Sequence, residues 1–240
     1  MLKTPNTILV TNDDGWQAPG IKALVYALRG LARIVVVAPD APRSGASRSF
    51  TCTTPVRLQL VRTEGDVEWY ACTGTPVDCV KLAFDALLTE KPILVASGIN
   101  LGDNASVSIH YSGTMGAAIE GALKHTPSIG FSLATFDPAA DYSPTLPFVR
   151  QIAEEAIRDG MPDGTCLNVN FPPVPEIKGT RRCRAARGEW IEEVEPCNAP
   201  RGGQWYWFTG RFQCLEPDAP DTDMTALAQG YASIVETNVY

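Results

Sequence analysis

The chain has 240 residues, of which 45% are hydrophobic and 20% charged, and its formal net charge is −7. A chain of this length can bury a sizeable core without stabilising disulfides or metals. No apolar run approaches the roughly 20 residues of a membrane-spanning helix, so no membrane partner is expected. The negative balance also argues against tight binding to a nucleic acid polymer.

Cysteine and histidine usage limits the chemistry further. The seven cysteines form no C-x-x-C pair, which argues against a disulfide framework and a zinc knuckle. Only Cys183, Cys197 and Cys214 leave room for a local bridge. The N-terminus lacks the apolar core of a signal peptide, so a cytoplasmic location is expected. With two histidines in the chain, a metal site must depend on oxygen ligands.

Short apolar runs alternate with helical patterns along the first two thirds of the chain. The expected strands cover residues 7–11, 34–38, 93–97, 128–132 and 166–170. Helical spacing follows Pro19-Gly20, Thr75-Pro76 and Thr114, and recurs around Phe148. This alternation predicts an α/β fold with a doubly wound, mostly parallel sheet, and the continuous apolar strands fit a sheet covered on both faces.

The composition and the periodicity of the sequence change after Phe171-Pro-Pro173. An Arg-rich, aromatic stretch without helical period follows to about residue 221 and predicts an extended β-hairpin or a small subdomain. A short helix from Thr222 and a strand at 232–235 close the chain. We therefore expect a catalytic core over 1–173, a hairpin or oligomerisation extension over 174–221, and a helix and strand over 222–240 that return to the core.

Polar residues follow three of the predicted strands, where ligands bind in open parallel sheets. Asp13 and Asp14 follow the first strand, Ser44 lies in the loop after the second, and Asn100 follows the strand at 93–97. Carboxylate, hydroxyl and amide oxygens suit a hard cation such as Mg²⁺ or Mn²⁺. Each residue alone is more typical of a turn or a helix cap, so the metal site depends on their convergence.

A second group, Ser112, Gly113 and Thr114, lies at the start of a predicted helix. Free backbone N–H groups and the helix dipole favour an anion there, although a plain Ser/Thr N-cap is the commoner explanation. The glycines at 113, 116 and 121 do not fit G-x-G-x-x-G, which argues against a nicotinamide cofactor.

In seven segments the chain resembles the SurE family of stationary-phase survival proteins, and the resemblance covers nearly the full length. The segments are ILVTNDDGWQAPGI, VVAPDAPRSGAS, CTGTPVDCV, VASGIN, YSGTMGAAIEGAL, LNVNFPP and TDMTALAQGYASI. The resemblance implies a Rossmann-like core, a requirement for Mg²⁺ or Mn²⁺, and a dimer or tetramer. It also implies hydrolysis of nucleoside monophosphates, with polyphosphate as a further substrate.

The resemblance also implies roles for individual residues. Asp13, Asp14, Ser44 and Asn100 match the family's metal ligands. Asn104 matches a second active-site asparagine, and residues 112–114 match its phosphate-contacting turn. The expected mechanism uses the metal to polarise the phosphoryl oxygens and activate water, with Asp13 assisting. A covalent aspartyl-phosphate on Asp13 is the mechanistic alternative.

Asn104, the turn at 112–114 and Arg43 are expected to stabilise the charge on the phosphoryl oxygens. The competing function is a nucleotide-binding sensor without turnover, and a dehydrogenase lacks its fingerprint. His110 and the Trp205-Tyr206-Trp207 run could touch substrate, but an exposed histidine and hairpin packing are the simpler interpretations.

Four arginines, at positions 181, 182, 184 and 187, leave two further interpretations open. They form either a solvated hairpin edge or a binding surface for long phosphate chains.

Overall fold

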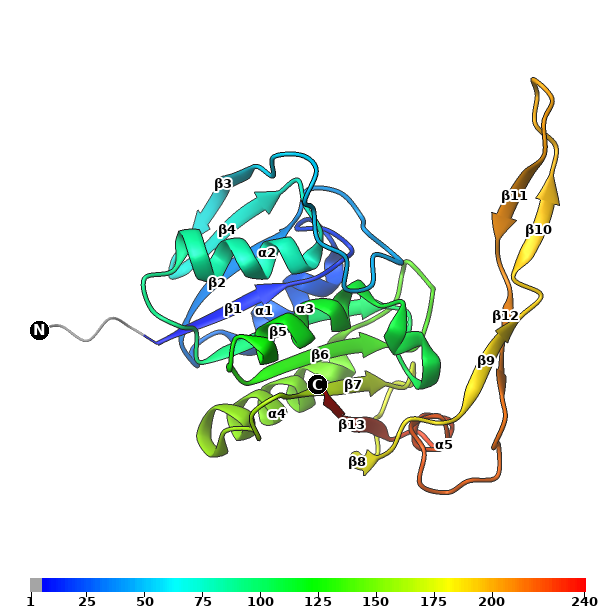
Figure 1. Cartoon of the computed structure of the whole chain (residues 1–240). Coiled ribbons are helices and arrows are strands. Elements are labelled where there is room, and N and C mark those ends of the chain that lie inside the picture. Colours follow the sequence, from blue (N-terminus) through cyan, green and yellow to red (C-terminus); the bar gives the residue numbers. More distant parts are fainter. Residues whose placement is uncertain (1–5) are drawn as a thin grey trace, which may run out of the picture.

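The computed structural model describes residues 6–240 and contains a nine-stranded sheet with helices on both faces (Figure 1). Six central strands run parallel, while β3 and β13 each run antiparallel to a neighbour. This confirms the predicted mostly parallel α/β sheet. In spatial order the strands are β3 (Leu58–Glu64), β4 (Val67–Cys72), β2 (Arg33–Pro39), β1 (Thr7–Thr11), β5 (Leu94–Leu101), β6 (Ser128–Leu133), β7 (Thr165–Phe171), β13 (Ala232–Asn238) and β8 (Thr180–Cys183).

Alternate residues of the central strands pack into hydrophobic cores on opposite faces of the sheet. Ile8 and Val10 of β1 face the core formed with α1 (Pro19–Leu28) and α4 (Leu146–Asp159). Leu9 faces the opposite core, formed with α2 (Pro76–Leu82) and the start of α3 (Gly113–Leu123). Successive strand side chains point to opposite faces, so both faces must be covered. The doubly wound arrangement is therefore confirmed.

The remaining helices are short. A π-helical turn, η1 (Ala83–Leu87), continues α2, and two 3₁₀ turns, η2 (Ser106–His110) and η3 (Ser143–Thr145), lie in loops. The helix α5 (Asp223–Ala228) precedes β13, as expected. Within residues 6–240 no helix combines the length and apolar character needed to cross a bilayer. Residues 1–5, part of the segment used to argue against a signal peptide, lie outside this range.

The sequence did not predict the hairpin of β3 and β4. The side chains of β3 are partly or fully exposed, and a bulge interrupts its pairing with β4 between Leu60 and Arg62. An edge strand of this kind carries charge rather than an apolar run, so it lacks the signal that identified the central strands.

Two consecutive antiparallel ribbons project from the core as an arm, defined here as residues 188–214 (Figure 1). The inner ribbon pairs β9 (Gly188–Ile191) with β12 (Arg211–Cys214), and the outer ribbon pairs β10 (Val194–Cys197) with β11 (Trp205–Phe208). The predicted C-terminal hairpin extension is confirmed. Cys183, Cys197 and Cys214 are unpaired, so the local bridge left open by the sequence does not form.

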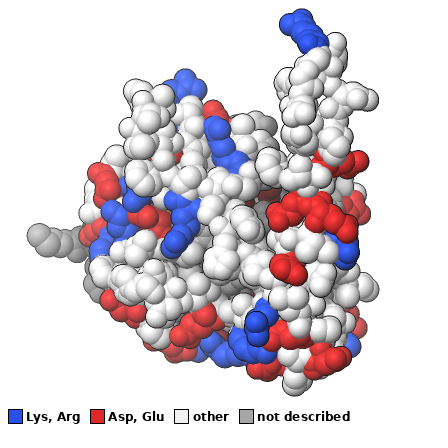
Figure 2. Space-filling model, turned by 45° about the vertical axis from the view of Figure 1, so that its right-hand side comes forward, with Lys and Arg blue, Asp and Glu red and all other residues white. Residues whose placement is uncertain are grey.

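Charge is unevenly distributed over the arm. Figure 2 shows acidic side chains over its base and a tip that is mostly uncharged below its outermost end. The exposed acidic residues are Glu189, Glu192, Glu193 and Glu195, and the tip exposes Val194, Trp205, Tyr206, Trp207 and Phe208.

Candidate active site

The order of the strands reverses between β1 and β5. From β1 the chain moves outward to β2 and β4, then returns to β5 and continues to β6 and β7. The carboxyl ends of strands at such a switch point leave a crevice for ligands. Asp13 and Asp14 follow β1, and Asn100 lies at the carboxyl end of β5. The fold therefore brings these loops to one place.

A cleft of about 440 Å³ opens there. Asp14 borders the site without lining the cleft itself. The predicted residues that line the cleft are Asp13, Ser44, Asn100, Asn104 and Ser112. Sequence reasoning thus identified five side chains that the fold does bring together.

Asp13 is buried against the start of α3. Its Oδ1 accepts a hydrogen bond of 2.5 Å from Thr114 Oγ1. A Cβ on Gly113 would lie 2.8 Å from the Asp13 Cβ, so only glycine allows this approach. Ser112 caps the helix, because its Oγ accepts from Met115 N at 3.0 Å. The N-terminus of α3 therefore holds a carboxylate of the protein itself.

The turn that presents the two carboxylates is fixed by Asn12. Its Nδ2 donates to Gly15 O at 3.0 Å, and its Oδ1 accepts from Gly15 N at 3.1 Å. Gly15 has φ +99°, a conformation that favours glycine. Asp14 Oδ2 accepts from Leu101 N at 3.2 Å, which links the β1 and β5 loops.

The electrostatics of the site favour a cation. Burial raises the pKa of Asp13, and hydrogen bonds from Thr114 and nearby backbone offset this only in part. Burial and the charge of Asp13 raise the pKa of Asp14 to about 6. Burial also raises the pKa of Asp103, which lines the same cleft. Among the described residues no Lys or Arg lines the cleft, so no cationic side chain there balances the charge of the carboxylates.

These oxygens fit a hard divalent cation. In residues 6–240 no group of three or more His, Cys, Asp and Glu side chains could hold a metal. The candidate set instead combines two carboxylates with the hydroxyl of Ser44 and the amide oxygen of Asn100. Asn100 Nδ2 already donates to Gly102 O at 2.7 Å, and its Oδ1 is then the atom that could bind a cation.

Ser44 is exposed at the cleft on a loop that packs over α3. Ser47 N donates to Tyr111 O at 3.1 Å, and Ser47 Oγ donates to His110 O at 2.6 Å. A Cβ on Gly116 would lie 2.3 Å from Ser47 O, so this contact requires glycine. The side chain of His110 is exposed and does not line the cleft.

Two predicted phosphate ligands have other partners. The Arg43 guanidinium donates to Thr73 O at 2.9 Å and lies 3.4 Å from Asp40 Oδ1, outside the cleft lining. Thr114 is fully buried, and its hydroxyl donates a hydrogen bond to Asp13. Thr114 is thus placed to orient Asp13, an arrangement that the sequence did not suggest.

The sequence missed the residues that hold Asn104. Asn104 N donates to Asn170 Oδ1, Asn104 Nδ2 donates to Ser132 Oγ, and Asn104 O accepts from Asn168 Nδ2, each at 2.7 Å. Asn170 Nδ2 in turn donates to Asn168 Oδ1 at 2.9 Å. The signal was present in LNVN, because two asparagines on one face of a buried strand must find partners.

The arm also reaches the site, which the sequence did not predict. Trp190, Glu193 and Thr209 line the cleft together with Asp13, Ser44 and Asn100. By contrast, Trp205 and Trp207, which the sequence singled out, lie on the exposed outer ribbon. None of the four arginines at 181–187 lines the cleft.

Comparisons with known proteins agree with this geometry. The family model "Survival protein SurE" matches residues 8–192. The chain is 49% identical to a 5′-nucleotidase SurE of Phocaeicola vulgatus, over 100% of this chain and 93% of the relative. It is 49% identical to the one of Bacteroides thetaiotaomicron, over 97% and 90%. A crystal structure of a SurE protein from Aquifex aeolicus superposes with a TM-score of 0.83 at 36% identity, covering 98% of this chain and 94% of that chain.

Proposed function

Because the chain belongs to the SurE family, we propose that it is a metal-dependent 5′-nucleotidase that hydrolyses nucleoside monophosphates to nucleoside and phosphate. The observation that carries this proposal is the convergence of Asp13, Ser44 and Asn100 in one cleft at the switch point of the sheet. The relatives are named for turnover, so a sensor without turnover is not favoured.

Asp13, Asp14, Ser44 and Asn100 would hold Mg²⁺ or Mn²⁺. The bound ion supplies Lewis acidity toward the phosphoryl oxygens. Asp13 is held in one orientation by Thr114 and can accept a proton from attacking water. A direct attack of Asp13 on phosphorus is the alternative, and trapping of a phosphoenzyme would distinguish the two.

Asn104 is proposed to position the phosphoryl group. The Asn104 backbone is fixed by Asn170 and Asn168, and its Nδ2 donates one N–H to Ser132 Oγ. The second N–H of Nδ2 is the group that would donate to a phosphoryl oxygen. The Ser112–Thr114 turn contributes by orienting Asp13, and Gly113 allows the helix to approach. Arg43 stays a predicted phosphate ligand that would have to leave Thr73 to reach the cleft.

Phosphate release tests this function directly. Nucleoside 5′- and 3′-monophosphates, sugar phosphates and polyphosphate should be assayed with Mg²⁺, with Mn²⁺ and with EDTA. We expect release from 5′-monophosphates only with a divalent ion, and recovery after EDTA when the ion is restored. Nucleotide binding without phosphate release under all these conditions would favour the sensor.

We also propose that residues 174–221 serve oligomerisation, with 1–173 as the catalytic core and 222–240 returning to it. The strand β11 of the outer ribbon exposes large apolar side chains on both faces, since Trp207 is 67% and Phe208 86% exposed at neighbouring positions. Such surfaces mark protein contacts. Light scattering should give a homodimer or homotetramer for the wild type, and a smaller species for Trp207→Ser/Phe208→Ser but not for Tyr26→Ser on α1.

A cytoplasmic location is part of the same proposal. All seven cysteines are unpaired, including the buried neighbours Cys72 and Cys79. This is the state expected in a reducing compartment. A fluorescent fusion expressed in the native cell should report the location.

A further inference from the structure

The cleft contains a second group of side chains that the metal site does not use. Three aromatic residues, Tyr111, Phe136 and Trp190, line it together with Glu193 and Thr209. The oxygen ligands would bind a cation, and the cation would bind a phosphate. Aromatic rings take part in neither contact. The second group therefore needs a ligand part that is flat and apolar on its faces.

These three rings are not buried in the core of the fold. Phe136 is 76% and Tyr111 58% exposed. The Phe136 ring lies over Gly102, where a Cβ would come within 2.8 Å of it. Trp190 is only partly buried and meets Phe212 at 6.1 Å with an interplanar angle of 70°. Exposed rings at the rim of a cleft are typical of stacking surfaces for nucleobases.

We infer that the inner ribbon of the arm forms the nucleoside subsite, with Trp190 as the base-stacking residue. This inference rests on the proposed function and adds the part of the substrate that the metal loops do not bind. Glu193 accepts no hydrogen bond and forms no ion pair through its carboxylate among the described residues. Its carboxylate is therefore free to accept hydrogen bonds from the sugar hydroxyls or a base amino group.

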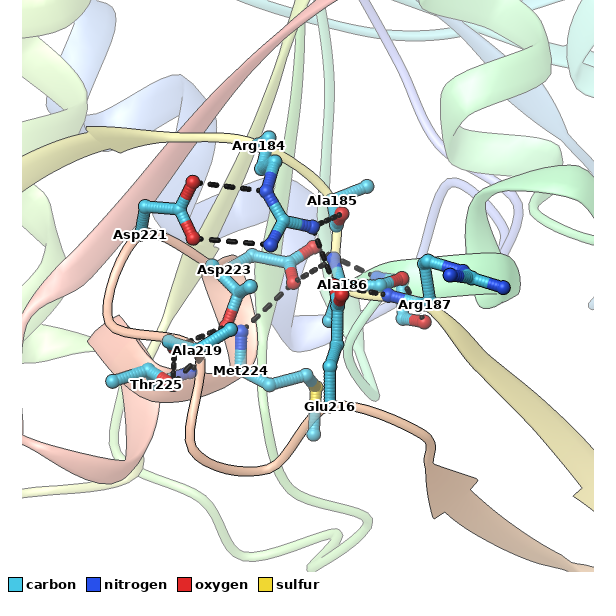
Figure 3. Close-up of polar contacts among 12 residues, drawn as sticks. Arg184, Ala185, Ala186, Arg187, Glu216, Ala219, Asp221, Asp223, Met224 and Thr225 are labelled. Atoms are coloured by element: carbon cyan, nitrogen blue, oxygen red, sulfur yellow. Dashed lines mark hydrogen bonds and ion pairs between the residues drawn. The ribbon is translucent and has the colours of Figure 1, made fainter.

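The subsite can act with the metal loops because the root of the arm is fixed to them. The fully buried Asp223 accepts a hydrogen bond from Ala186 N at 2.9 Å (Figure 3). It accepts another from Ser106 N at 2.8 Å. Ser106 Oγ donates to Ala186 O at 2.7 Å. Ser106 follows Asn104 by two residues, and Ala186 precedes the arm. One carboxylate thus ties the phosphate-positioning loop to the arm.

A pair of substrates with and without a base tests the inference. AMP and ribose 5-phosphate share the phosphate and the sugar. For Trp190→Ala we expect the KM for AMP to rise by about tenfold to a hundredfold, the usual range for losing one stacked base, with kcat nearly unchanged. The KM for ribose 5-phosphate should change less than twofold. Trp190→Phe keeps a ring and should recover most of the affinity for AMP.

Adenosine, which has no phosphate, provides an independent readout. It should inhibit AMP hydrolysis competitively in the wild type and in Tyr26→Ala, whose ring is exposed on α1, but far more weakly in Trp190→Ala. Equal effects of Trp190→Ala on AMP and ribose 5-phosphate would overturn the subsite, as would unchanged inhibition by adenosine. Absence of metal-dependent phosphate release from the wild type would instead overturn the proposed function.

Discussion

The innermost strands of the sheet are buried along their whole length, whereas the strands of the arm are exposed or only partly buried. Every residue of β1, β6 and β7 is buried, while every residue of β11 is exposed. Asp13 and Asn100 are positioned by the close packing of the central strands, which allows their backbone only small shifts. The arm positions Trp190 through backbone pairing and the hydrogen bonds of Asp223. Catalytic geometry thus depends on the core, and substrate recognition depends on a polar link to it.

Removing a proposed metal ligand at the carboxyl ends of the central strands should have the largest effect. Asp13→Asn should lower kcat/KM for AMP by about a thousandfold, because Lewis-acid catalysis contributes several kcal/mol of transition-state stabilisation. Circular dichroism should show an intact fold. The exposed Asp66, in the β3–β4 turn, gives the control Asp66→Asn. More than a tenth of the wild-type activity in Asp13→Asn would exclude Asp13 from the metal site.

The hydroxyl behind Asp13 should have the next largest effect. Thr114→Val removes the 2.5 Å donor to Asp13 Oδ1 and keeps the shape of the side chain. We expect the affinity for Mn²⁺ to fall about tenfold to a hundredfold, the usual cost of losing an orienting partner of a metal ligand. Thr114→Ser should restore it. Calorimetric titration measures the Mn²⁺ affinity of both variants. If Thr114→Val binds Mn²⁺ normally but binds AMP weakly, Thr114 contacts the phosphate and does not orient the metal ligand.

The link between core and arm is tested by Asp223→Asn. Asp223 Oδ1 accepts from Ala186 N and Met224 N, and Oδ2 accepts from Ser106 N. Both oxygens of Asp223 accept from backbone N–H groups. In either orientation of the Asn side chain, the NH₂ group would therefore face a backbone N–H, and neither could accept a hydrogen bond. A buried mismatch of this kind costs about 1–3 kcal/mol.

We therefore expect Asp223→Asn to lower the free energy of unfolding, raise the KM for AMP and lower kcat for both AMP and ribose 5-phosphate. Urea unfolding and steady-state kinetics measure these effects. Asp221→Asn, whose carboxylate is 62% exposed beside Arg184, is the matched control. If the two variants behave alike, Asp223 does not couple the arm to the site.

The paired carboxylates should also set the pH dependence of the metal-free protein. Burial, followed by the charge of Asp13, raises the pKa of Asp14 from 3.8 to about 6. Between these values the folded protein keeps a proton that the unfolded chain has lost, so the free energy of unfolding falls as pH rises from about 4 to about 6. Urea titrations in EDTA should show this slope, and Asp14→Asn should reduce it. Added Mg²⁺ should restore stability at neutral pH, and a slope unchanged in Asp14→Asn would contradict the assignment.

Sequence reasoning was successful where one local signal determines the structure. Apolar runs identified the central strands, and the rule that ligands lie beyond strand ends identified Asp13, Ser44 and Asn100. It failed where a side chain is defined by a distant partner. Nothing near Trp190 in the sequence indicates that the arm returns to the cleft, since that contact depends on Asp223, which lies beyond the arm in the chain.

The smallest effect is expected from the arginine cluster before the arm. Arg184 donates to Asp221 and Glu216 (Figure 3). Arg181 donates to Gln229, and its Cζ lies 3.6 Å from the centre of the Tyr231 ring. These guanidinium groups already have partners within the fold, so they are not free to collect phosphates.

Arg184→Ala should therefore lower hydrolysis of AMP and of polyphosphate by the same small factor, with the same salt dependence for both. The thermal midpoint should fall only slightly, because exposed ion pairs contribute little to stability. Arg182→Ala, a neighbouring arginine outside this ion-pair cluster, is the control. A loss confined to polyphosphate in Arg184→Ala would show that the ion pairs open to bind long anions, and the root of the arm would then be a second phosphate site rather than a structural joint.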